Sequence, residues 1–148
     1  MKIITFILLL LILVPLYAFN GIVPISKTTY WERKMDILFH AIAYVESGNN
    51  PMAYNAKENA IGLCQIRLIA VKEVNRIYKL NIKHIDCYKI STTYKVFILT
   101  MKAYNKEGDF ERGSRCWNAG ANGWYVTETN PYWEKVEAVL KTNKIILK

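Results

Sequence analysis

The sequence contains few of the residues that bind metals or form crosslinks, and this shortage excludes two kinds of small protein. Its two histidines, His40 and His84, lie far apart, and no cysteine or histidine pair has the spacing of metal ligands. We therefore predict no metal and no other cofactor, and we interpret both histidines as structural. The three cysteines, Cys64, Cys87 and Cys116, cannot all pair within one molecule, which excludes a fully disulfide-bonded framework. Three single pairings remain open, and each leaves one thiol free.

Internal repeats and low-complexity linkers are also lacking, so we expect neither a repeat array nor a string of domains. Proline and glycine cluster only where helices should end. A chain of 148 residues with 52% hydrophobic and 13% aromatic content fits one domain with a packed core. The same composition excludes a disordered tail.

Acidic residues are scarce relative to basic ones. Lysine and arginine together number 20 and aspartate and glutamate 12, which gives a formal net charge of +8. This imbalance predicts an anionic partner such as lipid head groups or acidic cell-wall polymers, although generic solubility explains it equally well. Nucleic acid is disfavoured as a partner because the lysines are scattered and form no compact basic run.

The first residues have the pattern of an export signal. An aliphatic run from 3 to 19, with only two interruptions, follows the basic Lys2. At roughly 1.5 Å per residue the run is about 25 Å long, which is short of the roughly 30 Å of a bilayer core. We expect residues 1–19 to be a signal peptide, with an uncleaved membrane anchor as the alternative. Residues 20–148 would then form an exported domain in the periplasm or cell envelope.

Hydrophobic residues recur at spacings of three and four, which predicts a mostly α-helical fold. The predicted helices cover residues 30–47, 63–78, 92–104 and 110–117, and a last helix begins at 130. The first has an apolar stripe made of Trp31, Met35, Leu38, Ile42 and Val45. The second has a stripe made of Ile66, Ile69, Ala70, Val74 and Ile77. Residues 49–61 are predicted to form a small β-hairpin or an irregular segment.

Glu46 stands at the end of the first predicted helix, in a setting that should keep its carboxyl protonated. Gly48 can adopt the left-handed conformation that ends helices, and Pro51 pushes its neighbour toward extended geometry, so the chain turns directly after Glu46. The negative end of the helix dipole and burial beside Tyr44 and Val45 would both raise the pKa of the carboxyl. A protonated carboxylic acid in a cleft is the group that cleavage of a glycosidic bond requires. The alternative is an ordinary exposed glutamate in a last helical turn.

A second carboxylate for that chemistry is missing from the neighbouring sequence. Asp36 lies ten residues earlier, about 15 Å along the same helix, which is too far for a partner. Glu58 is the other nearby acid, and we expect it to be solvated in a polar loop between Lys57 and Asn59. Because most glycosidases use two carboxylates, a single acid favours a reaction in which a hydroxyl of the substrate is the nucleophile.

Four segments stand out in order along the chain: Glu46-Ser47, Ala60-Ile61-Gly62-Leu63-Cys64-Gln65-Ile66, Trp117-Asn118-Ala119-Gly120 and Thr129-Asn130-Pro131-Tyr132-Trp133. In their order and spacing they resemble the lytic transglycosylases of the soluble, lysozyme-like SLT-domain type, which cleave the glycan backbone of peptidoglycan. The family pattern is a Glu-Ser pair, a Gly-Leu-x-Gln-Ile segment, a Tyr-Asn-Ala-Gly segment and a tyrosine just inside the closing helix. The resemblance covers about residues 36–139. It implies a single, mostly α, lysozyme-like domain whose partner is the peptidoglycan glycan strand.

The resemblance also implies a role for each site residue. Glu46 would be the catalytic acid and base, cleaving the β-1,4 bond between N-acetylmuramic acid and N-acetylglucosamine and leaving a 1,6-anhydromuramic end. Gln65 and Asn118 would offer amide groups to the sugars, and Tyr132 would direct its hydroxyl toward Glu46 or the sugar. The implied substrate-binding residues are Ser47, Gln65, Trp117, Asn118 and Tyr132, of which Ser47 is expected to cap or orient rather than attack.

The sequence departs from the family pattern at three points. Trp117 replaces the usual tyrosine, which keeps an aromatic wall but loses a hydroxyl. Cys64 replaces a methionine or another apolar residue. Pro131 stands inside the Glu-Thr-x-x-Tyr element. Tyr54 and Trp124 are further aromatic residues with the surface to stack on sugars.

Three other functions stay open at this point. The first is a hydrolase similar to goose-type lysozyme, in which water replaces the C6 hydroxyl of muramic acid. The second is a non-enzymatic, cationic module that binds the cell wall, and the third is a membrane-active cationic protein. Membrane attachment through residues 1–19, a role with a secretion apparatus or a phage, and the oligomeric state are also left open.

Overall fold

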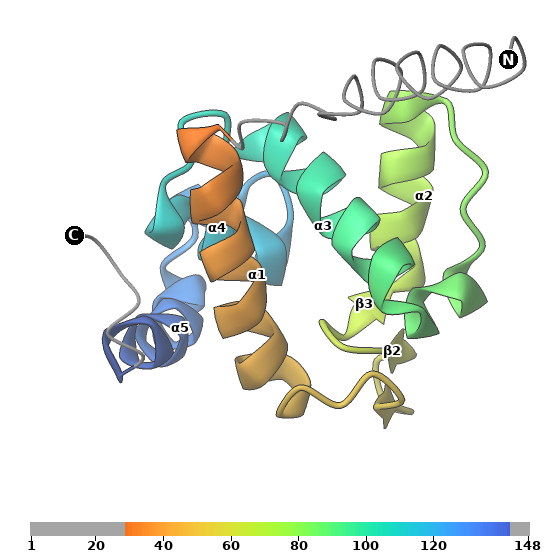
Figure 1. Cartoon of the computed structure of the whole chain (residues 1–148), viewed down its shortest axis with the longest axis horizontal. Coiled ribbons are helices and arrows are strands. Elements are labelled where there is room, and N and C mark those ends of the chain that lie inside the picture. Colours follow the sequence, from red (N-terminus) through yellow and green to blue (C-terminus); the bar gives the residue numbers. More distant parts are fainter. Residues whose placement is uncertain (1–28, 143–148) are drawn as a thin grey trace, which may run out of the picture.

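The computed structural model describes residues 29–142, in which five α-helices pack with a small β-sheet (Figure 1). The helices are α1 (Tyr30–Ser47), α2 (Leu68–Tyr78), α3 (Ile90–Tyr104), α4 (Phe110–Ala119) and α5 (Asn130–Thr142). The strands are β1 (Tyr54–Asn55), β2 (Ala60–Ile61) and β3 (Ile66–Arg67), and the 3-10 helices are η1 (His84–Tyr88), η2 (Gly123–Tyr125) and η3 (Thr127–Thr129). The prediction of a mostly α fold is therefore confirmed.

The segment predicted as a signal peptide, residues 1–19, lies outside the described residues. Within residues 29–142, each helix is too short or too polar to cross a membrane.

Helix α1 begins and ends where its local sequence predicts. At its start the Thr29 hydroxyl accepts a hydrogen bond from the backbone N–H of Glu32, and the Glu32 carboxylate accepts one from the N–H of Thr29. At its end Gly48 has a left-handed backbone with φ of +62°. The predicted apolar stripe is confirmed at its centre, because Leu38 and Ile42 are fully buried. This stripe places α1 against α3, α4 and α5.

The hydrophobic core lies between α1, α3 and α5, where Leu38, Ile42, Phe97, Met101 and Val136 are fully buried. The Phe97 ring contacts the rings of Phe39 and Trp117, with centroids 5.3 and 5.4 Å apart. Burying side chains of this size contributes roughly 1.5–3 kcal/mol each to folding. The core therefore holds the end of α1 at a defined place relative to α4 and α5.

The chain between α1 and α2 forms a three-stranded antiparallel sheet in the order β1-β2-β3. Ile61 of β2 pairs with Tyr54 on one side and Ile66 on the other. The predicted hairpin is thus present, and a third strand extends it. The prediction of a helix from residue 63 is wrong, because Gly62 and Gln65 have φ of +74° and +48°, which an α-helix does not contain.

The late start of α2 also corrects its predicted apolar stripe. Ile66 belongs to β3, and Ile69 is 66% exposed. Val74 is buried as predicted. The periodicity continued across the turn at Gln65 only by coincidence, because a short strand and the first turn of a helix both place apolar residues at close intervals.

Gly62 lies where β2 passes close to the backbone of η1. A Cβ at this position would lie 2.2 Å from the carbonyl oxygen of Cys87, and the backbone φ is +74°. Gly48 has a similar φ of +62°, but no atom lies within 4 Å of its Cβ position. Both glycines have a left-handed backbone, and of the two only Gly62 also has a neighbouring backbone atom too close for a Cβ.

We expect Gly62→Ala to lower the free energy of unfolding by about 3 kcal/mol, since a left-handed backbone disfavours alanine and the contact with Cys87 adds an overpacking penalty. Gly48→Ala is the matched control and should lose only about 1 kcal/mol. Urea denaturation followed by circular dichroism measures both losses. Equal losses would show that the approach to Cys87 is not what requires a glycine at position 62.

Candidate functional site

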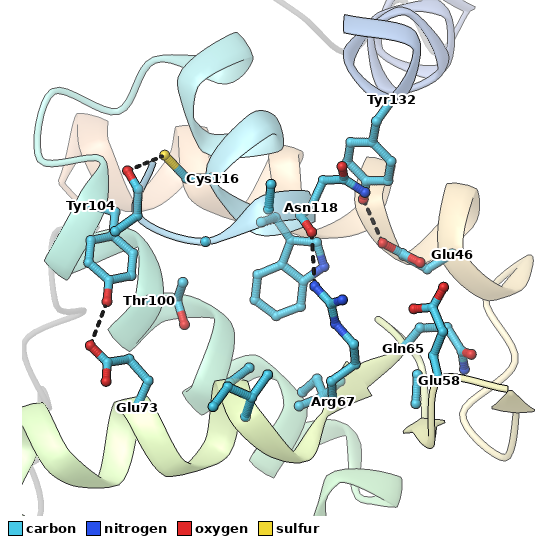
Figure 2. Close-up of a pocket in the computed structure, with 18 of the residues that line it drawn as sticks. Glu46, Glu58, Gln65, Arg67, Glu73, Thr100, Tyr104, Cys116, Asn118 and Tyr132 are labelled. Atoms are coloured by element: carbon cyan, nitrogen blue, oxygen red, sulfur yellow. Dashed lines mark hydrogen bonds between the residues drawn. The ribbon is translucent and has the colours of Figure 1, made fainter. Parts of the chain in front are cut away.

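One cleft in the described part of the chain brings together the ends of several elements. It has a volume of about 740 Å³ and opens between the end of α1, the sheet, α2 and α3, and residues of α4 and α5 (Figure 2). Five of the six predicted site residues line it, namely Glu46, Gln65, Trp117, Asn118 and Tyr132. They come from α1, the turn before β3, α4 and α5, so segments far apart in the sequence meet in one place.

Glu46 projects from the last turn of α1 into this cleft, where its carboxyl is largely buried. The Tyr132 hydroxyl, 86 residues later in the sequence, donates a hydrogen bond to Glu46 Oε1 at 2.8 Å (Figure 2). Burial raises the pKa of Glu46, and the Tyr132 hydrogen bond opposes this shift by stabilising the ionised form. Burial is the larger effect, so the pKa remains raised.

Tyr132 keeps its own proton in this position. Burial, followed by the charge of Glu46, raises the pKa of its hydroxyl well above the ordinary value. The hydroxyl therefore acts as a donor toward Glu46 throughout the ordinary pH range.

The sequence correctly predicts the direction of the Glu46 pKa shift but assigns part of the burial to the wrong residue. Tyr44 is 57% exposed and points away from the core. Cys64 is instead the buried neighbour, and its own pKa is raised by burial and by the charge of Glu46. The surroundings of Glu46 thus include side chains from the turn before β3 and from α5, which are distant in sequence.

Three charged side chains line the cleft around Glu46 and act on its pKa. The negative charge of Glu58 raises the pKa of Glu46, while the positive charges of Arg67 and Lys135 lower it. Glu58 is exposed, as predicted, and it also lines the cleft, which the sequence did not show. A second carboxylate is therefore present beside Glu46.

Sequence reasoning missed both basic residues of this group. Arg67 directly follows the Gln65-Ile66 segment, and this adjacency to a motif is the sequence signal that could have indicated it as a site residue. Lys135 lies three residues after Tyr132, so the two share one face of α5.

Ser47 does not line the cleft but connects its parts. Its hydroxyl donates to the carbonyl of Leu63 at 2.7 Å and accepts from the backbone N–H of Asn50 at 3.0 Å. This ties the end of α1 to the turn in which Gln65 lies. Gln65 has a left-handed backbone and donates through Nε2 to the carbonyl of Gly62 at 3.0 Å, and it lines the cleft.

The end of α4 forms the opposite wall. Trp117 is half buried against Phe97 and contributes an aromatic surface to the cleft. The backbone carbonyl of Asn118 accepts a hydrogen bond from Arg67 Nη2 at 3.0 Å, which links this wall to β3 (Figure 2). Gly120 has φ of +79°, yet no atom lies within 4 Å of its Cβ position, so it serves the turn and not a close approach.

A further polar group lines the cleft on the side of α2 and α3, and sequence analysis did not find it. Tyr104 donates to Glu73 Oε1 at 2.9 Å, and Arg76 binds both oxygens of the same carboxylate at 2.7 and 2.8 Å. These hydrogen bonds, first that of Arg76 and then that of Tyr104, lower the pKa of Glu73 to about 2. Glu73 is therefore ionised in any ordinary buffer.

Two aromatic residues named as sugar-stacking candidates are not brought to the cleft. Tyr54 is 58% exposed on β1, and it is absent from the cleft lining. Trp124 is also absent from the lining, because its ring lies under the Arg115 guanidinium at 5.1 Å.

Arg115 clamps α4 to the segment that leads into α5. Its Nε donates to the Thr129 hydroxyl at 2.8 Å, its Nη2 donates to the carbonyl of Val126 at 3.1 Å, and its Nη1 pairs with Glu111 at 2.9 Å. Thr129 is 1% exposed and lies three residues before Tyr132. The clamp therefore fixes the position of the first turn of α5, and this places the Tyr132 hydroxyl beside Glu46.

We expect Thr129→Val to lower the free energy of unfolding by about 1–3 kcal/mol, because a nearly isosteric side chain leaves the half-buried Arg115 Nε without its acceptor. Thr127→Val is the matched control at an exposed position and should change stability by less than about 0.5 kcal/mol. Thermal and urea unfolding measure both. An unchanged stability in Thr129→Val would contradict the clamp.

The cysteines and histidines take no part in this cleft as a metal or disulfide site. Cys64, Cys87 and Cys116 are all free and buried, so none of the three pairings left open by the sequence is formed. His84 Nε2 lies 2.7 Å from the carbonyl oxygen of Ile66, which gives it a structural contact. Across residues 29–142, no three His, Cys, Asp or Glu side chains are grouped to hold a metal ion.

Comparison with known proteins identifies the family. Residues 24–122, about two thirds of the 148-residue chain, match the family described as Transglycosylase SLT domain. The matched range contains Glu46, Gln65 and Asn118, but it ends before Tyr132. Neither a search of curated proteins nor a search of solved structures found a significant match. The ordered motifs, the mostly α fold and the matched range together show that the chain belongs to the SLT transglycosylase family, the lysozyme-like lytic transglycosylases that act on peptidoglycan.

Proposed function

We propose that this protein is a lytic transglycosylase that cleaves the β-1,4 bond between N-acetylmuramic acid and N-acetylglucosamine and leaves a 1,6-anhydromuramic end. One observation carries the proposal: the Glu46 carboxyl lies largely buried in the cleft with a raised pKa and accepts a hydrogen bond from Tyr132 at 2.8 Å. A carboxyl with a raised pKa retains a proton to donate at a pH where an ordinary glutamate is ionised. Membership of the SLT transglycosylase family supports peptidoglycan as the substrate.

Glu46 acts first as a general acid and then as a general base. Its proton passes to the bridging oxygen as the bond from muramic C1 to that oxygen breaks, which frees the 4-hydroxyl of N-acetylglucosamine. The Glu46 carboxylate then removes the proton of the muramic C6 hydroxyl, whose oxygen bonds to C1 and closes the anhydro ring. This step restores the proton on Glu46 and consumes no water. The attack is intramolecular, with an effective molarity of about 10⁵ M or more in good geometry.

The surrounding residues support these two steps. Tyr132 orients the carboxyl and stabilises the carboxylate that exists between them. Gln65 and Asn118 present amide groups to the N-acetyl and hydroxyl groups of the sugars, and Trp117 offers a face on which a ring stacks. Ser47 is a positioning residue, because it holds the turn that carries Gln65.

A peptidoglycan hydrolase similar to goose-type lysozyme is the second candidate, and Glu58 is the observation that favours it. Its carboxylate lines the same cleft as Glu46 and acts on the pKa of Glu46. In a hydrolase such a second carboxylate activates a water, which replaces the C6 hydroxyl and produces a reducing end. We favour the transglycosylase because Glu58 is exposed and because the family is one of transglycosylases.

Mass analysis of the muropeptides released from purified peptidoglycan separates these candidates. We expect anhydromuramic ends from the wild type and from Glu58→Gln, and about 10²- to 10⁴-fold less product from Glu46→Gln, which lacks the acid. Reducing ends in place of anhydro ends, lost in Glu58→Gln, would establish the hydrolase instead. Full activity in Glu46→Gln would remove Glu46 from the mechanism and leave a role in wall binding.

The stability of Glu46→Gln provides the control for that experiment. A raised pKa means that the folded state binds this proton more tightly than the unfolded state, whose pKa is about 4.3. The protonated Glu46 therefore stabilises the folded state fully at a pH below the unfolded pKa. This stabilisation is lost as the pH rises through the pKa of Glu46 in the folded protein. We therefore expect equal melting temperatures for the two proteins at pH 4, and an equal or higher one for the variant at pH 8. A much lower value at pH 8 would show that unfolding causes the loss of activity.

The pH dependence of cleavage should respond in opposite directions to two variants. Activity falls as the pH rises through the pKa of Glu46, because the acid loses its proton. Tyr132→Phe removes a hydrogen bond that lowers this pKa, so the alkaline limb moves to higher pH. Glu58→Gln removes a charge that raises it, so the limb moves to lower pH. If the alkaline limb of the pH–activity profile shifts in the same direction in both variants, the pKa of Glu46 does not set that limb.

We also propose that the protein is exported to the periplasm or cell envelope, since its substrate lies there and residues 1–19 have the pattern of an export signal. The positive charge of the chain, +8, suits an anionic wall.

A further inference from the structure

Arg67 lies across the cleft. It ends β3, and its exposed side chain reaches the end of α4, where Nη2 donates to the carbonyl oxygen of Asn118 at 3.0 Å (Figure 2). Within residues 29–142 this is the single hydrogen bond of the Arg67 side chain, and the side chain forms no ion pair there. We call this contact the Arg67 bridge.

The Arg67 bridge lies between two groups of cleft residues, which are on either side of it in Figure 2 and define two compartments of the cleft. The catalytic compartment contains Glu46, Glu58, Gln65 and Tyr132. The far compartment contains Glu73, Thr100 and Tyr104. Both belong to one continuous cleft that Arg67 also lines, so the bridge occupies part of the passage between them.

The far compartment has the chemistry to receive a sugar. Thr100 and Tyr104 bring hydroxyl groups, and Glu73 brings a carboxylate that Arg76 and Tyr104 hold in place. Such a fixed, ionised carboxylate accepts hydrogen bonds from sugar hydroxyls. Apolar side chains of α2 line the same cleft, so polar and apolar groups both face it.

A glycan strand is a continuous chain, so a strand that occupies both compartments has to pass the Arg67 side chain, and opening the bridge would clear its path. The bond joins a charged donor to a neutral carbonyl at an exposed position, and a bond of this kind is worth enough to change binding about tenfold. A strand whose end lies in the catalytic compartment leaves the bridge intact. Breaking the Arg67 bridge therefore weakens the binding only of strands that continue past Arg67.

We propose that Arg67 is a specificity-determining residue that selects glycans by how far they extend beyond the catalytic compartment. The wild type thus favours bonds near a strand end and releases short products, and removal of the bridge admits strand interiors. The inference rests on the proposed function, because it takes the glycan strand as the ligand of the cleft. It deepens that function by naming the part of the substrate that the cleft prefers.

The test compares two purified glycans, a short oligosaccharide and a long strand, as substrates of the wild type and of Arg67→Ala. We expect the ratio of kcat/KM for the long strand to that for the short one to rise about tenfold in Arg67→Ala, with a shift from short to long products. An unchanged or lower ratio would overturn the proposal. Assays at each variant's own optimum pH separate this effect from the influence of the Arg67 charge on Glu46.

Lys72→Ala is the matched control for loss of a positive charge, because Lys72 is exposed on α2 and does not line the cleft. It should leave the ratio at the wild-type value, and a rise equal to that of Arg67→Ala would also overturn the proposal. Binding of the same two glycans to Glu46→Gln and to Glu46→Gln with Arg67→Ala gives a second readout that needs no cleavage. If the wild type cleaves neither glycan, the proposed function fails, and the ratio of these Kd values still decides the role of Arg67.

Discussion

The hydrogen bond between Tyr132 and Glu46 is the contact on which the rest of the site depends. It joins the first and last helices of the described chain across 86 residues of sequence. Burial alone would leave a neutral acid that resists ionisation, and a solvent-exposed carboxyl would lose its proton too early. The Tyr132 hydroxyl supports the carboxylate in a largely buried place, and the proposed reaction needs both protonation states of Glu46.

Several other contacts maintain that geometry. The core around Phe97 holds α1, α3 and α5 together, and the Arg115 clamp sets the chain that enters α5. On the other side Ser47 fastens the end of α1 to the turn of Gln65. The site is therefore formed by the ends of helices and strands that buried packing holds in place. Its walls differ in the functional groups that they present. The turn between β1 and β2 supplies the carboxylate of Glu58 and α1 that of Glu46, while the end of α4 supplies an aromatic wall and a backbone acceptor.

Local sequence predicts the parts of this fold that depend on local physics. The start and end of α1 follow from Thr29, Glu32 and Gly48, whose side chains or backbone act within one turn. The start of α2 was misplaced because Gln65 adopts a left-handed backbone that its residue type does not announce. Glu58 is exposed, as its polar loop predicts, but sequence position does not show that it lines the cleft beside Glu46.

The sequence by itself determined the helical class, the acid at the end of the first helix and the order of the motifs, since periodicity and helix capping act between near neighbours. Tertiary structure alone decided which side chains surround that acid. Tyr132 donates a hydrogen bond to it and Cys64 and Glu58 lie near enough to interact with its charge, while Tyr44, its near neighbour in sequence, is exposed. Arg67 likewise reaches Asn118 over 51 residues. Such contacts depend on how helices pack, and packing is a property of the whole chain.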